Sequence, residues 1–286
     1  MKESLFVEKF YNNVDNLIIS DTEIVTKQFL SVMKPPKGTN TIIKYALGDV
    51  ICHLGEFNQK SCIHIHIAPT FRGVHGLSTV LSKLKVKTVI VIGMAGGIDT
   101  SLSLGDVLIA NSIISIRSDK SEDIFRCTQL NCISQMFLNS RNIIDNYKTD
   151  FKVSIGALGT INMVVRDKDA IKRINRKILA LDIGYYDLYQ LFSIHNIENW
   201  FVVKGIVDFV DSKKNDQFQI MAINNCLKVC QQLVLNTEKD DTLPFSKRTI
   251  FISSTCYDLA DIRSELASFL KDYGKRVLWS ESPDFP

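Results

Sequence analysis

The sequence predicts an α/β protein with a covered sheet. Three observations carry this prediction: short runs of β-branched residues alternate with amphipathic stretches from residue 16 to about residue 235, the composition is globular, and the chain is long enough for a large core. Hydrophobic residues make up 45% of the 286 residues and charged residues 23%, which excludes wholesale disorder and fibrous repeats. We expect one large domain, or one large domain with a small one.

The individual elements follow from hydrophobic periodicity. Residues 87–93 (KTVIVIG) are apolar on both faces, as in a central strand, and residues 77–84 have the apolar spacing of a helix packed against that sheet. Two more buried strands are expected at 106–114 and 200–206. Residues 217–235 are expected to form a long helix with one apolar side. This order predicts helices on the faces of a sheet.

The composition changes near residue 236, and a small unit follows. A polar, charged segment with Pro244 is typical of a linker, after which 249–254 is expected to be a strand, 257–273 a helix and 276–279 a second strand. This β-α-β unit of about 38 residues buries too little surface to fold by itself. It is expected to pack on the first domain, to pair with another chain, or to begin a longer domain. The predicted units are residues 1–236, a linker at 237–248 and a partial domain at 249–286.

Charge, hydropathy and cysteine content exclude several functions. Lys plus Arg (34) nearly balances Asp plus Glu (31), so neither a nucleic acid nor a membrane is an expected partner. No hydrophobic run reaches the ~18 residues of a membrane span, and the charged N-terminus does not resemble a signal peptide. The seven cysteines contain no Cys-x-x-Cys pair, so disulfides and zinc are not expected. We expect a cytoplasmic protein without metal or cofactor.

A glycine-rich segment follows the clearest strand. Glycines at the carboxyl end of a strand let a ligand approach the backbone, and open α/β sheets bind ligands at that edge. The residues expected to touch a ligand are Gly93, Met94, Ala95 and Gly96. Glycines that serve only packing are the alternative.

Asp208 lies at the end of the hydrophobic strand that begins at residue 200. A carboxylate there is costly unless it has a partner or a chemical role. Asp211, three residues on, fits a turn or a helix cap better. Asp208 is therefore the candidate reactive carboxylate.

Together these elements carry a resemblance to a known family. The stretch from residue 42 to residue 235 resembles the nucleoside phosphorylase and nucleosidase superfamily, which implies a three-layer α/β fold with a mixed central sheet. The segments that carry the resemblance are 45–48 (YALG), 91–98 (VIGMAGGI) with 105–107 (GDV), 155–167 (IGALGTINMVVRD) and, most specifically, 205–219 (GIVDFVDSKKNDQFQ).

The resemblance implies cleavage of the bond between base and ribose in a purine nucleoside or nucleotide. In such enzymes the base leaves from an oxocarbenium-like centre, so the base needs a proton and the sugar needs a nucleophile. Asp208 matches the family's general acid, which donates toward purine N7; a partly desolvated carboxylic acid can hold that proton at neutral pH. Glu23, favoured over Asp21, corresponds to the acidic residue that activates water. The alternative for Glu23 is a carboxylate that stabilises a helix N-terminus.

Several positions depart from the family pattern. The Glu-Met-Glu run that binds the sugar corresponds to Asp182, Ile183 and Gly184, so the second glutamate is missing and Asp182 is expected to take over part of its work. Met94 replaces a hydroxyl residue, and Val91 replaces the arginine that phosphorylases use for phosphate. Without that charge, hydrolysis is favoured over phosphorolysis.

Other polar residues give weaker signals. Arg72 is the candidate contact for a nucleotide phosphate, with a surface arginine as its alternative. His64 and His66 share one face of a strand at a spacing that metal ligands use, but no third ligand is evident. Three tyrosines at helical spacing are expected in the core rather than against a base: Tyr185, Tyr186 and Tyr189.

The C-terminal unit has a resemblance of its own. Residues 250–263 (IFISSTCYDLADIR) resemble the opening of a TIR-related domain of unknown function, found beside STAND-type NTPases and in other bacterial conflict proteins. This implies a truncated Rossmann-like β-α-β fragment. A purine-cleaving domain beside such a module resembles antiviral defence proteins in which the first domain is the effector, and it implies a STAND-type NTPase or another signalling protein as partner.

The favoured function is a purine nucleosidase that acts on a nucleoside or on a nucleotide such as ATP. A homo-oligomer is expected, because members of this superfamily usually build their sites near subunit boundaries. Three alternatives stay open: a nucleotide-sensing or assembly module without turnover, a phosphorylase, and an enzyme that cleaves a dinucleotide such as NAD.

Overall fold

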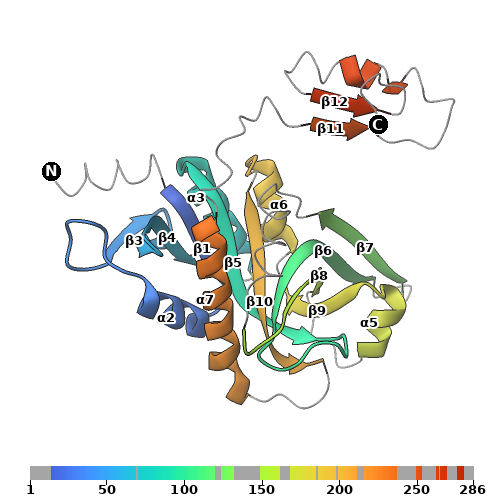
Figure 1. Ribbon diagram of the computed structural model, residues 1–286, viewed down its shortest axis with the longest axis horizontal. Coiled ribbons are helices and arrows are strands. Elements are labelled where there is room, and N and C mark those ends of the chain that lie inside the picture. The colour runs from blue at the N-terminus through green and yellow to red at the C-terminus, as the bar shows by residue number, and fades with distance from the viewer. Residues whose placement is uncertain are drawn as a thin grey trace. The chain divides into compact units, whose positions relative to one another are not determined.

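The computed structural model divides the chain into two compact units, residues 1–236 and residues 237–286 (Figure 1). The residues that the structure describes are 14–68, 70–119, 124–131, 149–161, 168–184, 186–197, 199–210, 216–236, 249–252, 262–263, 265–268 and 276–279.

The first unit is built on one mixed sheet. Its strands lie in the order β10-β6-β8-β9-β5-β1-β4-β3-β2, with β7 beside β6, and an additional pairing of β10 with β5 closes a ring through β9, β8 and β6. Strand β5 runs parallel to β1 and β10 and antiparallel to β9. The strands are β1 (Val14–Ser20), β2 (Ile43–Leu47), β3 (Val50–Phe57), β4 (Lys60–His66), β5 (Val86–Gly97), β6 (Val107–Asp119), β7 (Ile124–Asn131), β8 (Val153–Ile161), β9 (Ile178–Ile183) and β10 (Trp200–Phe209).

Helices cover both faces of this sheet, which confirms the predicted three-layer α/β fold. Helices α2 and α7 pack on one face, and α3 and α6 on the other (Figure 1). The helices are α2 (Glu23–Val32), α3 (Phe71–Lys83), α5 (Lys168–Ile174), α6 (Tyr186–Ile194) and α7 (Gln219–Asn236), with a 3₁₀ turn, η1 (Asp216–Phe218). Among the described residues, no helix has both the length and the hydropathy needed to cross a membrane.

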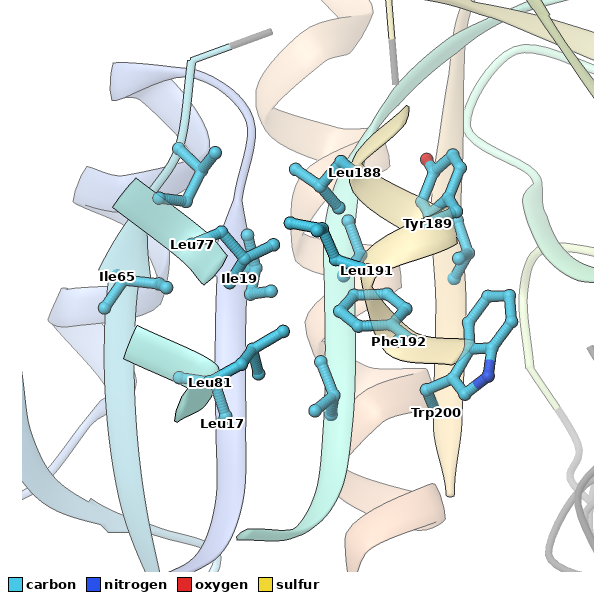
Figure 2. Packing of buried hydrophobic residues seen from close by; sticks show 14 of the residues in the cluster. Leu17, Ile19, Ile65, Leu77, Leu81, Leu188, Tyr189, Leu191, Phe192 and Trp200 are labelled. Carbon is cyan, nitrogen blue, oxygen red and sulfur yellow. The ribbon is translucent and has the colours of Figure 1, made fainter. Parts of the chain in front are cut away.

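Strand alternation separates the core on one face of the sheet from the core on the other. In β1, Leu17 and Ile19 belong to the cluster under α3 and α6, whereas Ile18 belongs to the cluster under α2 and α7. Figure 2 shows the first cluster, in which Phe192 of α6 lies against Trp200 at the start of β10, their ring centroids 5.1 Å apart. Each such large side chain contributes about 1.5–3 kcal/mol by its burial.

The strands run further than the sequence predicts. The expected strand 87–93 continues through the glycines as far as Gly97, and the expected strand 200–206 continues to Phe209. Both extensions matter for the site, because Gly93–Gly96 and Asp208 lie within strands β5 and β10 rather than in loops.

The second unit contains a parallel pair of strands, β11 (Thr249–Ile252) and β12 (Arg276–Trp279). Residues 262–263 and 265–268 between them are helical, in the predicted strand-helix-strand order. The rest of the expected helix and the linker 237–248 lie outside the described residues.

Candidate functional site

A buried ion cluster lies near the carboxyl end of strands β1, β9 and β10. Lys204 of β10 is fully buried, and its Nζ lies 3.0 Å from Oδ2 of Asp21 and 3.0 Å from Oδ2 of Asp182. Asp21 follows β1 directly and Asp182 is the second-last residue of β9. Their exposed fractions are only 6% and 4%. We call Asp21, Lys204 and Asp182 the ion cluster.

The ion cluster lies on the α3/α6 face of the sheet. Val202 and Ile206 of β10 point into the hydrophobic cluster of that face, and Lys204 stands between them in the strand alternation. Tyr189 of α6 completes the arrangement, because its hydroxyl donates to Asp182 Oδ2 at 2.9 Å. The other oxygen of Asp182, Oδ1, is buried and has no hydrogen-bond partner among the described residues.

The two carboxylates keep Lys204 charged. Burial by itself would lower the pKa of the lysine, but the charges and hydrogen bonds of Asp21 and Asp182 outweigh it and hold the pKa above its ordinary value. One ammonium therefore stands between two carboxylates in a space without bulk water.

The glycine at position 93 is required by this cluster. A Cβ atom built on Gly93 would lie 1.7 Å from Asp21 Oδ2 and 2.6 Å from Lys204 Nζ. The next backbone amide, that of Met94, donates to the same Asp21 oxygen at 3.3 Å. The absence of a side chain at Gly93 therefore leaves room for Asp21 and Lys204.

Asp208 lies four residues after Lys204 on β10, close to the end of the pairing between β10 and β5. The register shifts between Ile206 and Asp208, so that Ile206 pairs with Ala95 and Asp208 with Gly96. Asp208 is half-buried, and its Oδ1 would lie 2.8 Å from a Cβ on Gly96. A substituent on Gly96 would therefore displace the candidate acid.

The two carboxylates near the start of α2 differ sharply in burial. Thr22 caps the helix by accepting from the amide of Val25, so Glu23 becomes the first helical residue and is exposed. Asp21, on the other side of the cap, is buried in the ion cluster. The sequence prediction favoured Glu23, whereas the structure puts Asp21 beside Asp182.

The remaining predicted ligand residues are distributed around this edge. Ala95 is buried and Met94 partly buried on β5, while Ile183 at the end of β9 is 48% exposed. Arg72, the second residue of α3, is exposed, as a surface arginine would be. Gly184, where the family pattern has a glutamate, adopts a φ of 80° and donates its amide to the carbonyl of Ile161.

Other expectations concern metals, cysteines and tyrosines. His64 is fully buried and His66 exposed, and no group of three metal-binding side chains occurs in the part of the chain that the structure describes. Tyr186 and Tyr189 lie in the core, as expected. Four cysteines are free and buried: Cys52, Cys62, Cys226 and Cys230. Asp211 and Tyr185 lie outside the described residues.

Sequence reasoning did not include Lys204 in the site. The signal was present, because a lysine inside the apolar run 200–206 needs buried counter-charges. Its partner Asp21 is 183 residues away along the chain, so the sequence alone offered no means to name it.

A comparison with family models shows the family, and a comparison with solved structures shows a similar fold. Residues 61–233 match the family model described as "Phosphorylase superfamily". No curated protein matches the sequence. Among solved structures, 5′-methylthioadenosine/S-adenosylhomocysteine nucleosidase from Neisseria meningitidis, in complex with methylthio-immucillin-A, is similar with a TM-score of 0.65 and 14% identity, over 77% of this chain and 98% of that one.

Two further solved structures give the same result. Futalosine hydrolase of Helicobacter pylori strain 26695 has a TM-score of 0.65 and 14% identity, over 79% of this chain and 98% of its own. S-adenosylhomocysteine nucleosidase from Streptococcus pyogenes, in complex with 5-methylthiotubericidin, has a TM-score of 0.64 and 18% identity, over 79% and 98%. At these identities the likeness concerns the fold.

Proposed function

Because the chain belongs to the phosphorylase superfamily, we propose that it is a purine nucleosidase, which hydrolyses the N-glycosidic bond of a purine nucleoside or nucleotide. The similar solved structures are two nucleosidases, each in complex with a small molecule, and a hydrolase. The observation that carries the proposal is the placement of Asp208: a half-buried carboxylate over Gly96, at the strand edge where α/β sheets bind ligands.

Asp208 acts in this proposal as the general acid. The purine leaves as an anion unless it is protonated, so a carboxylic acid that donates toward N7 lowers the barrier for departure. The sugar meanwhile becomes an electron-deficient oxocarbenium-like centre, which nearby carboxylates stabilise. The ion cluster supplies two carboxylates against one ammonium, and Asp182 Oδ1 is the acceptor that we assign to a ribose hydroxyl.

Water takes the place of phosphate as the nucleophile in this proposal. Val91, at the position where phosphorylases carry an arginine, is fully buried and apolar, so it offers no charge to a phosphate ion. Base release is therefore expected to proceed without phosphate: water supplies a hydroxyl to C1 of the sugar and a proton to the base, and any 5′-phosphates stay on the sugar. Strict dependence on added phosphate, with a sugar 1-phosphate as product, would show a phosphorylase instead.

The decisive experiment measures base release from a panel of candidate substrates, first with the parent protein and then with one test variant and one control variant. Purified protein is incubated with purine nucleosides, nucleotides including ATP, and NAD, with and without phosphate, and released bases are identified. Asp208→Asn keeps the size of the side chain but removes the transferable proton, so turnover should fall by roughly 10²–10⁴-fold. Asp49→Asn, in the exposed turn before β3, is the matched control and should leave turnover unchanged. Normal turnover in Asp208→Asn would contradict the mechanism.

The residue that activates water can be tested separately. Glu23 is exposed, so Glu23→Gln leaves the ion cluster intact and reports only on the role of its carboxylate. A large loss of turnover would establish Glu23 as the base that the sequence predicted. Turnover close to that of the parent would transfer this role to the buried Asp21.

A second candidate function is nucleotide sensing or assembly without turnover. The observation that favours it is Gly184, which provides no side chain where the family pattern has a sugar-binding glutamate. Isothermal titration calorimetry with the same panel separates the two: binding without base release, even at long incubation, identifies a sensor.

The oligomeric state, the cellular location and the partner protein are the remaining parts of the proposed function. We propose a cytoplasmic homo-oligomer that acts as the effector of a bacterial defence system, in which residues 249–286 belong to a TIR-like module that connects to a STAND-type NTPase. Sedimentation of the purified chain tests the oligomer, and a single monomeric species at micromolar concentration would contradict it. Co-purification with a STAND-type NTPase encoded nearby tests the partner.

A further inference from the structure

A chain of hydrogen bonds lies on the α2/α7 side of the sheet, away from Lys204. His64 Nδ1 lies 3.4 Å from His53 Nδ1, and His64 Nε2 lies 2.9 Å from Ser20 Oγ. Ser20 Oγ in turn lies 2.6 Å from Thr26 Oγ1, which donates to the carbonyl of Thr22 at 3.0 Å. We call His53, His64, Ser20 and Thr26 the relay.

Proton counting gives the relay one direction. Thr26 has a single hydroxyl proton and donates it to Thr22 O, so the proton in the bond to Ser20 comes from Ser20. Ser20 then has no proton left for His64, so His64 Nε2–H is the donor to Ser20. Neutral imidazole has one N–H, which leaves His64 Nδ1 as the acceptor of the Nδ1–H of His53.

The surroundings hold His64 in that neutral form. The side chain is fully buried, and its ring stacks on Phe29 of α2 with centroids 5.0 Å apart. His53 of β3 is only partly buried, so it is the more exposed of the two histidines in the relay. A proton added to His53 at Nε2 leaves every bond in place, whereas a proton added to His64 would set two N–H groups against each other.

The relay ends at the residues that flank Asp21. Ser20 precedes Asp21 and also accepts the amide of Ile67 at its carbonyl; Thr22 follows Asp21 and caps α2. The backbone on both sides of Asp21 is therefore fixed from one face of the sheet, while its carboxylate reaches Lys204 on the other.

From this geometry we propose that His64 is a positioning residue: held as the Nε2–H tautomer by His53, it orients Ser20 and thereby fixes the Asp21 carboxylate in the ion cluster. The inference deepens the proposed function, on which its kinetic part rests. Its structural part concerns the tautomer and the position of Asp21, and does not depend on turnover.

The first test is the tautomer. Nitrogen-15 NMR of histidine-labelled full-length protein at pH 7 should show His64 protonated at Nε2 and unprotonated at Nδ1, with the resonances assigned by comparison with His64→Gln. A Nδ1–H tautomer, or a charged His64, would overturn the proposal.

The second test compares two serines of the same region. Ser20→Ala breaks the relay, whereas Ser31→Ala removes a hydroxyl that only donates to the carbonyl of Gln28 on the exposed side of α2. The carbon-13 shift of the Asp21 carboxyl should change in Ser20→Ala and stay at its parent value in Ser31→Ala. Equal shifts in both variants would refute the positioning role.

The kinetic readout distinguishes positioning from mere stability. With an active parent, Ser20→Ala and His64→Leu should lower kcat by about 10-fold or more with KM nearly unchanged, as a small misplacement of a reacting group does. His64→Gln, which keeps an N–H for Ser20, should recover part of that loss. Unchanged kcat in Ser20→Ala would contradict the proposal, whereas an inactive parent would contradict the proposed function and leave the two NMR tests decisive.

Discussion

The ion cluster and the relay bury polar groups in opposite ways. Lys204 and His64 are both fully buried, but Lys204 keeps its charge between two carboxylates and has a raised pKa. His64 gives up its charge, because burial, together with the neighbouring His53 and His66, lowers its pKa to about 3. The difference shows that burial alone does not fix ionisation: counter-charges decide which group stays charged and which one works as a neutral hydrogen-bond donor.

Removal of the lysine should break this contrast most strongly. Lys204→Met leaves two buried carboxylates without their ammonium, which we expect to lower the free energy of unfolding by about 3–5 kcal/mol. Urea unfolding of parent and variant measures it. The variant with Asp21→Asn and Asp182→Asn added to Lys204→Met removes the charges together and should recover much of the loss. Parent-like stability in Lys204→Met alone would show that the ion pairs of Lys204 contribute nothing to the free energy of unfolding.

A smaller effect should follow from the tyrosine of the ion cluster. Tyr189→Phe removes the hydroxyl that donates to Asp182 Oδ2, and a buried hydrogen bond to a charged group contributes about 1.5–3 kcal/mol. Tyr186→Phe, on the same helix but outside the ion cluster, is the control. Thermal and urea unfolding should separate the two variants; equal losses would mean that the Tyr189 bond to Asp182 has no special weight.

The relay should make the free energy of unfolding depend on pH through His64. The folded-state pKa of His64 lies below the unfolded value of 6.5, so between about pH 3 and 6.5 the unfolded state binds a proton that the folded state does not. Stability from this source is complete above pH 6.5 and falls as the pH is lowered, by about 1.4 kcal/mol at pH 5.5. Urea unfolding at pH 7.5 and 5.5 measures it, and His64→Gln should reduce the difference. An unchanged pH dependence in His64→Gln would contradict this origin.

The fold could be predicted because it depends on periodicity. Apolar runs such as 87–93 and 200–206 are central strands whatever their partners are, so a sheet covered by helices follows from the sequence pattern. The three-layer arrangement was what the family resemblance implied. The ends of these strands were harder to place, since the glycines after residue 92 gave a turn signal while the pairing of β5 with β9 and β10 keeps them extended.

The candidate site could be predicted only in part. Asp208 was singled out from local sequence, because a carboxylate at the end of an apolar strand is unusual, whereas Asp182 was named only through the family resemblance. The choice between Glu23 and Asp21 depended on one capping hydroxyl, Thr22, which starts the helix between them. The cluster around Lys204 depends on strands β1, β9 and β10, which all pair with β5, and no local sequence pattern records that pairing.

The register shift between Ile206 and Asp208 decides which side of β10 Asp208 occupies relative to Lys204. In an unbroken strand, Asp208 would share the side of Lys204, because residues four apart point the same way. The extra residue resets the alternation, so Asp208 faces Gly96 while Lys204 faces Gly93. One inserted residue thus gives the two side chains different neighbours on β5: a Cβ at Gly93 would meet Lys204, and a Cβ at Gly96 would meet Asp208.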